Sequence, residues 1–368
     1  MARSGIARPR RRFPAWVALA ALAAACVHDV HRIGPLGPAS PERRPEVRVL
    51  LFGDFGYRTP MQWLAARALR RESRARPFDL ALQLGDNLYM CGPNPVRAGS
   101  GGCRFAADGA SVEPGVTPDD PLFRVNEGRL GGLVARDGTA LPIFLALGNH
   151  DIGWGSGCAV PGLSADEAAR RRACLSVARR TPTWTMPARH FVVDRGPLRL
   201  VVVDTNVVVA DYGGLTLDDE IAFVREATAA CGESLQCFLA GHHPPAAVHG
   251  YGRGRPPAYH ERMARLLAAA GGRARAFFAG HVHTLEHLSL GPLEVFVSGS
   301  TAMGGRAQRF RYRWPAAAQL RFATSAVGFA VLEADAEGYR VRFLDASGEP
   351  LHCCEAGRTG PCRPVECS

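Results

Sequence analysis

The chain has 368 residues, 47% of them hydrophobic, and a formal net charge of +10 at pH 7. This length and apolar content are typical of a globular protein with one large domain or two small ones. All 44 basic residues are arginine, and they form no dense basic patch interleaved with aromatic residues, so we expect no nucleic-acid partner.

The first 25 residues have the composition of a signal peptide. They contain five arginines and no acidic residue, so their removal lowers the formal charge from +10 to +5. The apolar run over residues 13–25 is too short to span a bilayer comfortably. The sequence Arg-Arg-Arg-Phe at 10–13 resembles a twin-arginine export signal, and the small residues before Cys26 resemble a bacterial lipoprotein cleavage site. We therefore expect an exported bacterial protein. Ordinary cleavage, a lipid on Cys26 and an uncleaved anchor all stay open.

Strands and helices alternate through most of the chain, which predicts an α/β fold. A Pro- and charge-rich tether at 26–46 should precede one large domain at 47–347 and a Cys-rich tail at 348–368. Apolar runs predict strands at 47–52, 78–84, 141–147, 190–194, 198–204, 237–240, 275–279, 293–298, 328–333 and 339–344. Helical patterns occupy 60–76, 165–180, 216–229 and 257–270, and 91–120 is typical of a long loop. In the first helix, Trp63, Leu64 and Leu69 should lie on the buried side.

Five of the predicted strands lead into short motifs that contain metal-ligand side chains. The motifs are Gly-Asp-Phe-Gly at 53–56, Gly-Asp-Asn-Leu-Tyr at 85–89, Gly-Asn-His-Asp at 148–151, Gly-His-His at 241–243 and Gly-His-Val-His at 280–283. Ligands of open α/β folds bind outside the carboxyl ends of the strands, so these side chains should meet at one edge. Oxygen and imidazole ligands suit iron, manganese and zinc. A pair of such ions, about 3.5–4 Å apart, can clamp both oxygens of a phosphoryl displacement. The sequence therefore predicts a two-metal hydrolase.

The five motifs resemble those of the purple acid phosphatases, within the calcineurin-like metallophosphoesterase superfamily. The nearest form is the small, tartrate-resistant mammalian type, and the resemblance covers residues 47–347. Tyr89, three places after Asp86, is the feature that the purple acid phosphatases add to the general superfamily pattern. The resemblance implies a four-layer α/β/β/α sandwich with two mixed sheets. It also implies an acid phosphatase that hydrolyses phosphate monoesters.

The resemblance assigns a role to each motif residue. A ferric ion would be bound by Asp54, Tyr89, His283 and the bridging Asp86. A divalent ion, which would be iron, zinc or manganese, would be bound by Asn149, His242, His281 and again Asp86. In this family a metal-bound hydroxide attacks phosphorus. His150 matches the histidine that contacts the substrate phosphate and handles a proton, and His249 matches a second such histidine.

Two other functions are compatible with the same motifs. One is a phosphodiesterase or nucleotidase with a different metal pair, which Tyr89 disfavours. The other is a catalytically silent binding module, which the complete set of ligands disfavours. His243 is the alternative to His242 as a ligand, and Asp151 is expected to orient the neighbouring His150. Four histidines have no motif around them and are expected to be ordinary surface or core residues: His190, His260, His287 and His352.

The chain has eleven cysteines, and setting Cys26 aside leaves ten. An even number of this size is typical of disulfides in an oxidising compartment. Proximity in the sequence groups Cys91 with Cys103, Cys158 with Cys174, and Cys231 with Cys237, without fixing the connectivity. The remaining four crowd the tail, at 353, 354, 362 and 367. A metal site is the alternative there, although the spacing matches no familiar zinc pattern.

Overall fold

The computed structural model describes residues 30–38, 45–97, 102–232, 234–248, 257–304 and 314–367. The predicted signal segment, Cys26 and His249 lie outside these ranges. The strands are β1 (Val30–Arg32), β2 (Val47–Phe52), β3 (Leu80–Gln83), β4 (Ile143–Leu145), β5 (Arg180–Thr181), β6 (Trp184–Thr185), β7 (Phe191–Arg195), β8 (Leu198–Val202), β9 (Gln236–Ala240), β10 (Ala274–Ala279), β11 (Leu285–Leu290), β12 (Leu293–Ser298), β13 (Gln319–Thr324), β14 (Gly328–Asp335), β15 (Gly338–Asp345), β16 (Pro350–Gly357) and β17 (Arg363–Val365). The helices are α2 (Pro60–Ala75), α3 (Pro121–Leu130), α4 (Ala165–Ala178), α5 (Asn206–Val209), α6 (Leu217–Ala227) and α7 (Pro257–Ala269).

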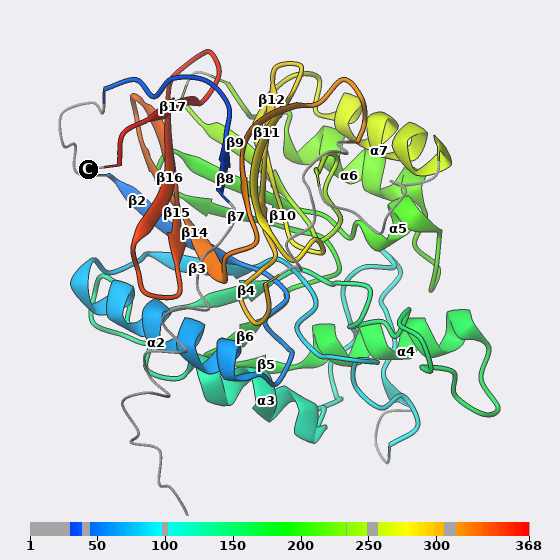
Figure 1. The fold of residues 1–368 in the computed structure, drawn as a ribbon. Coiled ribbons are helices and arrows are strands. Elements are labelled where there is room, and N and C mark those ends of the chain that lie inside the picture. The colour runs from blue at the N-terminus through cyan, green and yellow to red at the C-terminus, as the bar shows by residue number, and fades with distance from the viewer. Residues whose placement is uncertain are drawn as a thin grey trace, which may run out of the picture.

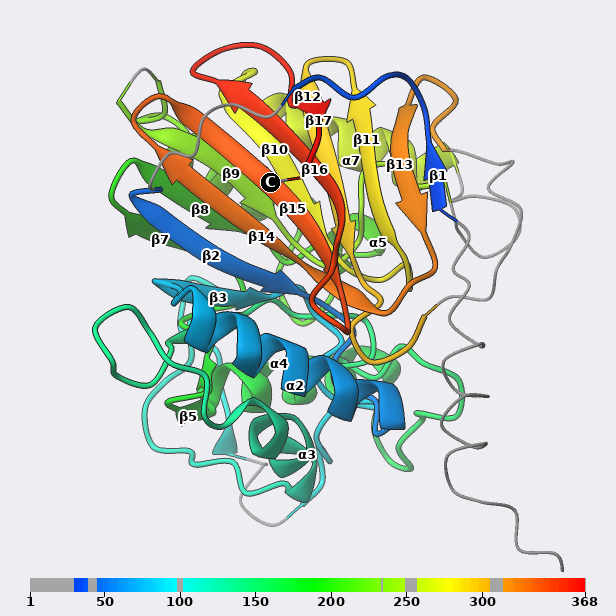
Figure 2. The ribbon, with the colours of Figure 1, turned by 60° about the vertical axis from the view of Figure 1, so that its left-hand side comes forward.

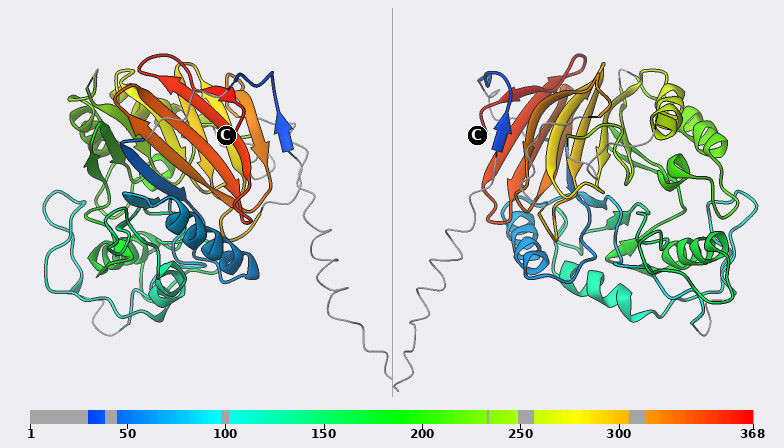
Figure 3. Two further views of the ribbon diagram at one scale, coloured as in Figure 1. Left: turned by 90° about the vertical axis from the view of Figure 1, so that its left-hand side faces the viewer. Right: turned by 45° about the vertical axis from the view of Figure 1, so that its right-hand side comes forward.

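Two mixed sheets form the centre of the molecule (Figures 1 and 2). The eight-stranded sheet has the order β1-β13-β11-β12-β10-β9-β8-β7, and the nine-stranded sheet has the order β17-β16-β15-β14-β2-β3-β4-β6-β5. One apolar core joins the sheets, with Phe52 and Phe343 from one and Phe278 and Phe296 from the other. A second apolar cluster packs α6 and α7 against the eight-stranded sheet, and the right-hand view of Figure 3 shows α7 outside that sheet. The predicted α/β fold with two mixed sheets is confirmed.

The five motif-bearing strands all belong to parallel blocks. β2 pairs in parallel with β3, and β3 with β4, in the nine-stranded sheet. β9 lies between β8 and β10 and is parallel to both in the eight-stranded sheet. Every residue of β2, β3 and β9 is buried, as is typical of parallel strands covered on both faces. Within each block, the carboxyl ends of the strands therefore open toward the same edge.

Helix α2 follows the first motif and begins as its sequence predicts. The Thr59 side chain accepts a hydrogen bond from the Gln62 backbone N–H, and Pro60 occupies the first turn. The buried face consists mainly of small alanines and Leu69, which allow the helix to approach the sheet closely. The placement of Trp63 on that face was wrong, because its side chain is 41% exposed and lies beneath the Arg67 guanidinium.

Several elements were not predicted from the sequence. Helix α3 begins directly after the loop predicted at 91–120. Strand β1, within the stretch predicted as a tether, pairs with β13. Strand β11 pairs with β12 and β13, while β16 pairs with β15 and β17. The last cysteines therefore lie on or beside strands of the nine-stranded sheet.

All ten cysteines outside Cys26 form disulfides. The first four pair as Cys91–Cys158 and Cys103–Cys174. The grouping by sequence proximity was wrong for these four, because the fold brings the segment after β3 beside the segment after β4. The remaining pairs are local, as expected: Cys231–Cys237, Cys353–Cys367 and Cys354–Cys362. Among the residues that the structure describes, no helix is long and apolar enough to cross a membrane.

Candidate metal centre

The motif side chains converge at the carboxyl ends of their strands. Asp54 follows β2, while Asp86 and Tyr89 follow β3. Asn149 and His150 follow β4, His242 follows β9, and His281 and His283 follow β10. Donor atoms of Asp54, Asp86 and His242 lie within 4.8 Å of one another, as do those of His242, His243 and His281. The structure thus brings all seven predicted ligands into one cluster that joins the two sheets.

One half of the cluster surrounds the Tyr89 hydroxyl. This group donates a hydrogen bond to Asp54 Oδ1 at 2.9 Å and lies 3.3 Å from His283 Nε2. His283 Nε2 is also 3.3 Å from Asp54 Oδ1. Ligand atoms about 2.0–2.2 Å from one metal ion are separated by distances of this size. These three side chains are the ones that the resemblance assigns to the ferric ion.

The other half of the cluster surrounds His242 Nε2. This nitrogen lies 3.1 Å from Asn149 Oδ1, 3.3 Å from Asp86 Oδ1 and 3.1 Å from His281 Nδ1. The other ring nitrogen, Nδ1, is 2.8 Å from the Leu84 carbonyl and donates to it. That hydrogen bond fixes Nδ1 as the donor to the backbone and leaves Nε2 facing the cluster. These nitrogen and oxygen atoms around Nε2 are all potential metal ligands, and a cation between them would be bound by all four.

The backbone at three of these residues is held in an unfavourable conformation. Among the described residues, the non-glycine residues with positive φ are Asp54 (56°), Asp86 (53°) and His281 (69°). Non-glycine residues seldom adopt this region, and such strain is concentrated at functional sites. Glycines provide the space for it: a Cβ on Gly148 would lie 2.2 Å from Asp86 Oδ1, and one on Gly85 would lie 2.5 Å from His242 Nδ1.

The electrostatics of the cluster favour positive charge. Burial opposes ionisation of Asp86, but His242 and His150 hold its pKa below the ordinary value. Burial also disfavours a charged His242, yet Asp86 and Asp54 raise the pKa of this imidazole to about 9. Burial, Asp54 and Asp86 raise the pKa of Tyr89 well above its ordinary value. Without metal, protons on His242 and Tyr89 thus lie where metal ions would bind. A bound cation would favour loss of these protons. The donor set and its charge fit a pair of metal ions.

His150 lies at the border of the cluster and points one nitrogen into it. Its Nε2 is 4.0 Å from Asp86 Oδ2, and its ring centre is 4.4 Å from that of Tyr89. The other nitrogen, Nδ1, donates to the Met90 carbonyl at 2.6 Å. Next to Met90, Cys91 is bonded to Cys158. The ring is therefore held from behind by a cross-linked segment.

Asp151 supports the site differently from what we expected. Its buried carboxylate accepts hydrogen bonds from Leu88 N, Asn87 Nδ2 and Gly148 N, at 2.7–2.8 Å. It therefore joins the loops after β3 and β4, whereas the His150 ring is oriented by the Met90 carbonyl. The prediction that Asp151 orients His150 directly was wrong.

Two supporting residues were missed in the sequence. Thr205 Oγ1 accepts hydrogen bonds from the backbone N–H groups of His242 (3.1 Å) and His243 (2.8 Å). The Glu286 carboxylate accepts from Val248 N at 2.9 Å and so holds the residue that precedes His249. A threonine has no motif that could have identified it, whereas Glu286 stands three places after His283 and offered a weak signal.

His243 lies beside His242 but does not face the same partners. The His243 ring is buried, and its centre lies 4.4 Å from that of His281. Its Nδ1 lies 3.2 Å from the Thr205 hydroxyl. His242, by contrast, directly contacts both Asn149 and Asp86. The geometry therefore supports the predicted choice of His242.

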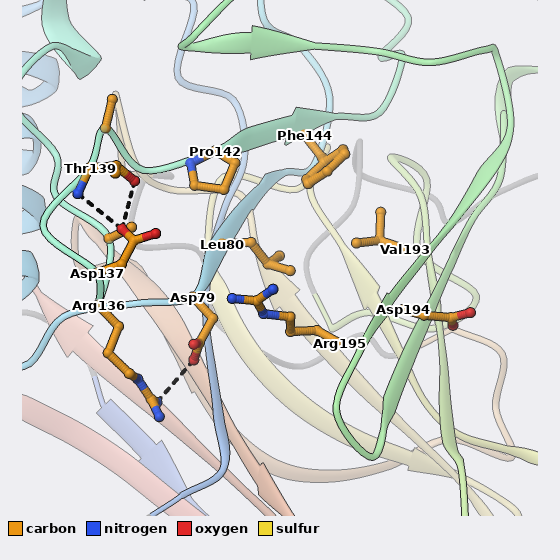
Figure 4. Close-up of a pocket in the computed structure, with 12 residues that line it drawn as sticks. Asp79, Leu80, Arg136, Asp137, Thr139, Pro142, Phe144, Val193, Asp194 and Arg195 are labelled. Carbon is orange, nitrogen blue, oxygen red and sulfur yellow. Dashed lines mark hydrogen bonds and ion pairs between the residues drawn. The ribbon is translucent and has the colours of Figure 1, made fainter.

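A large cavity lies elsewhere in the molecule, near the starts of β3 and β4. It has a volume of about 600 Å³, and its apolar lining includes Leu80, Phe144 and Val193. Figure 4 shows the Asp79–Arg136 ion pair (2.9 Å) at this cavity. None of the predicted ligands lines it. The candidate site is therefore identified by its cluster of metal-ligand atoms and not by the volume of a cavity.

Comparison of the sequence with known proteins finds a family model and a relative that each match most of the chain. A family model described as calcineurin-like phosphoesterase matches residues 47–285. Purple acid phosphatase 4 of Arabidopsis thaliana is 22% identical over 338 residues, which cover 85% of this chain and 84% of that protein.

Solved structures show the same fold at low sequence identity. GAP50, the anchor in the inner membrane complex of Plasmodium, has a TM-score of 0.61 and 16% identity, over 86% of this chain and 90% of that chain. Purple acid phosphatase PPD1 from yellow lupin (Lupinus luteus) seeds has a TM-score of 0.54 and 14% identity, over 83% of this chain and 53% of that chain. The family model covers well over half of the sequence, and the chain therefore belongs to the calcineurin-like phosphoesterase family.

Proposed function

We propose that this protein is an exported phosphomonoesterase with a dinuclear centre of one ferric and one divalent ion. The observation that carries the proposal is the Tyr89 hydroxyl, which contacts both Asp54 and His283. A tyrosine ligand is the feature by which the resemblance separates purple acid phosphatases from other members of the superfamily. The similarity to Purple acid phosphatase 4 over 85% of this chain supports the same choice.

The residues of the cluster would divide the work of phosphate hydrolysis. The bound ions would supply a nucleophile at neutral pH and would stabilise negative charge on the phosphoryl group. Asp54, Tyr89 and His283 would hold the ferric ion, Asn149, His242 and His281 would hold the divalent ion, and Asp86 would bridge them. Because Leu84 fixes the tautomer of His242, its Nε2 is already oriented toward the ion.

His150 is the residue proposed to act on the substrate. Its Nδ1–H is committed to the Met90 carbonyl, so Nε2 is the atom that faces the cluster. From this position, Nε2 can bind a phosphate oxygen or give a proton to the departing alcohol oxygen. A positioned acid of this kind contributes about 10²–10⁴-fold to a rate. His249 is proposed to assist, since Glu286 anchors Val248 immediately before it.

Export is supported by the cysteines. All ten cysteines outside Cys26 are paired, and disulfides of this density are typical of oxidising compartments. The proposed means of export is a cleaved signal peptide, with or without a lipid on Cys26. It is supported by the arginine-rich start and the apolar run before Cys26.

A paired assay tests the proposed reaction. The protein is loaded with iron and a divalent ion, its metal content is measured, and an aryl phosphate is compared with a bis-aryl phosphodiester. We expect faster hydrolysis of the monoester, and its loss in Asp86→Ala but not in the exposed control Asp218→Ala. Preference for the diester would favour the phosphodiesterase alternative. No hydrolysis of either ester by metal-replete protein would favour a binding module.

A further inference from the structure

A second group of metal-ligand side chains lies where the two sheets meet, apart from the proposed active site. His287 comes from β11 of the eight-stranded sheet, while His352 and Cys354 come from β16 of the nine-stranded sheet. All three are buried, and one donor atom from each lies within 4.8 Å of the others. Cys354 is bonded to Cys362, so a fourth possible ligand lies beside them.

The two imidazoles face each other in a defined protonation state. His287 Nε2 lies 3.0 Å from Glu294 Oε2 and donates to this carboxylate. His287 Nδ1 is then an acceptor, and His352 Nε2, 2.9 Å away, donates to it. His352 Nδ1 is buried and has no hydrogen-bond partner. One proton on His352 Nε2 therefore occupies the space between the two rings.

The surroundings keep both rings neutral and in place. The His287 ring stacks on Phe296 with centres 4.4 Å apart, and the His352 ring stacks on Phe322 at 4.6 Å. Burial lowers the pKa of His287, and burial together with His287 lowers that of His352. Neutral imidazole is the form that binds metal ions. The Glu294–His287 hydrogen bond is also the carboxylate–histidine arrangement that commonly orients a metal ligand.

We propose that this cluster is a binding site for a soft divalent ion such as Zn²⁺, and that the Cys354–Cys362 disulfide closes it. The proposed ligands are His287 Nδ1, His352 Nε2 and the two cysteine sulfurs. Two imidazole nitrogens and two thiolates are a donor set of the kind that zinc binds with tetrahedral geometry. Two thiolates balance the charge of the ion, and this lowers the cost of burying it. The ion takes the place of the shared proton and links the two sheets.

Opening the site requires a dithiol reductant. The dithiol gives two electrons and two protons to the Cys354–Cys362 bond, is itself oxidised to a disulfide, and leaves two cysteine thiols. Binding of the ion then releases the two thiol protons to solvent. The proton on His352 Nε2 moves to Nδ1, the nitrogen that has no partner. A small-molecule disulfide reverses these steps: it takes the two electrons and is reduced to its dithiol with two protons from solvent, the Cys354–Cys362 bond forms again, and the ion leaves.

The test removes one sulfur so that no reductant is needed. Cys362→Ser leaves a free Cys354 beside His287 and His352, while the other four disulfides can form. The probe is Co²⁺, because a cobalt–thiolate bond gives a near-ultraviolet charge-transfer band that the cysteine-free active site cannot give. We expect one equivalent of cobalt with this band. The matched control is Cys237→Ser, which frees Cys231 outside the ligand groups found among the described residues.

Two further variants identify the ligands. In the Cys362→Ser protein, His352→Phe should abolish the band, and Glu294→Gln should weaken cobalt binding by about 10–100-fold. The proposal is overturned if folded Cys362→Ser protein gives no thiolate band, if the Cys237→Ser control gives the same band, or if the band survives His352→Phe.

A measurement on the unaltered chain covers the case in which Cys362→Ser does not fold. The protein is reduced, refolded with Zn²⁺ under dithiol, and treated with an alkylating agent before mass spectrometry. We expect Cys354 and Cys362 to be protected by zinc, and Cys231 and Cys237 to be modified. Equal modification of both pairs would refute the site.

Discussion

Thr205→Val should destabilise the metal-free protein through the two histidine amides that it leaves unpaired. The side chain is fully buried, and Oγ1 accepts from His242 N at 3.1 Å and from His243 N at 2.8 Å. Valine has nearly the same shape but no acceptor. Each buried donor left unpaired costs about 1–3 kcal/mol, so the two amides alone should lower the free energy of unfolding by about 2–6 kcal/mol. The contact with His243 Nδ1 at 3.2 Å, which valine also removes, adds to this loss. Thr205→Ser keeps the oxygen and should restore most of the loss.

Urea denaturation of chelator-treated protein measures this effect without metal binding. The control is Thr228→Val, at the end of α6, where the hydroxyl donates to the Val224 carbonyl at 2.8 Å. That carbonyl also accepts from the Thr228 backbone N–H, so nothing is left unpaired and the loss should stay below about 1 kcal/mol. Equal losses at the two positions, or failure of serine to restore Thr205, would refute the reasoning.

Four more predictions concern the metals, the proton donor, the core and the N-terminus. Iron-loaded protein should be purple or pink, and Tyr89→Phe should be nearly colourless with iron still bound; a retained visible band would show that Tyr89 is not the ligand. His150→Ala should keep both metals and lose about 10²–10⁴-fold in kcat, and a change of only a few-fold would remove it from proton transfer. Because His287 and His352 have lowered pKa values in the folded state, the unfolded chain binds more protons below pH 6.5. The free energy of unfolding should therefore fall with decreasing pH, by up to about 1.4 kcal/mol per pH unit for each group, and His352→Phe should flatten this slope in acid denaturation series. Mass spectrometry of protein from its native host should find a mature terminus at or near Cys26, and an intact Met1 would exclude cleavage.

The parallel strands and the side chains that cluster at their carboxyl ends could be predicted because their physical signal is local. A strand buried on both faces must be continuously apolar, as in β2, and a ligand placed at its carboxyl end follows at once in the sequence. Five apolar runs and the polar residues that follow them were therefore enough to predict the ligand cluster. His249 stays a prediction, since it lies outside the described residues.

What could not be predicted depends on contacts between distant segments. Strand β11 reads Leu-Glu-His-Leu-Ser-Leu, and its buried polar residues find partners on other strands. His287 contacts Glu294 on the neighbouring strand β12 and His352 across the core. Its sequence alone gives no reason to expect such burial. The pairing of Cys91 with Cys158 likewise depends on β3 and β4 being neighbours. The exposure of Trp63 follows from the alanines of α2, which form the closer contact.

The Cys91–Cys158 disulfide also bears on when a newly made chain becomes active. It fixes the segment whose Met90 carbonyl orients His150. Before this bond forms, no covalent link fixes Cys91, next to Met90, against the segment after β4, and the imidazole loses this support. For the exported phosphatase proposed above, a nascent chain would then be poorly active in a reducing compartment and would become competent only after this disulfide had formed.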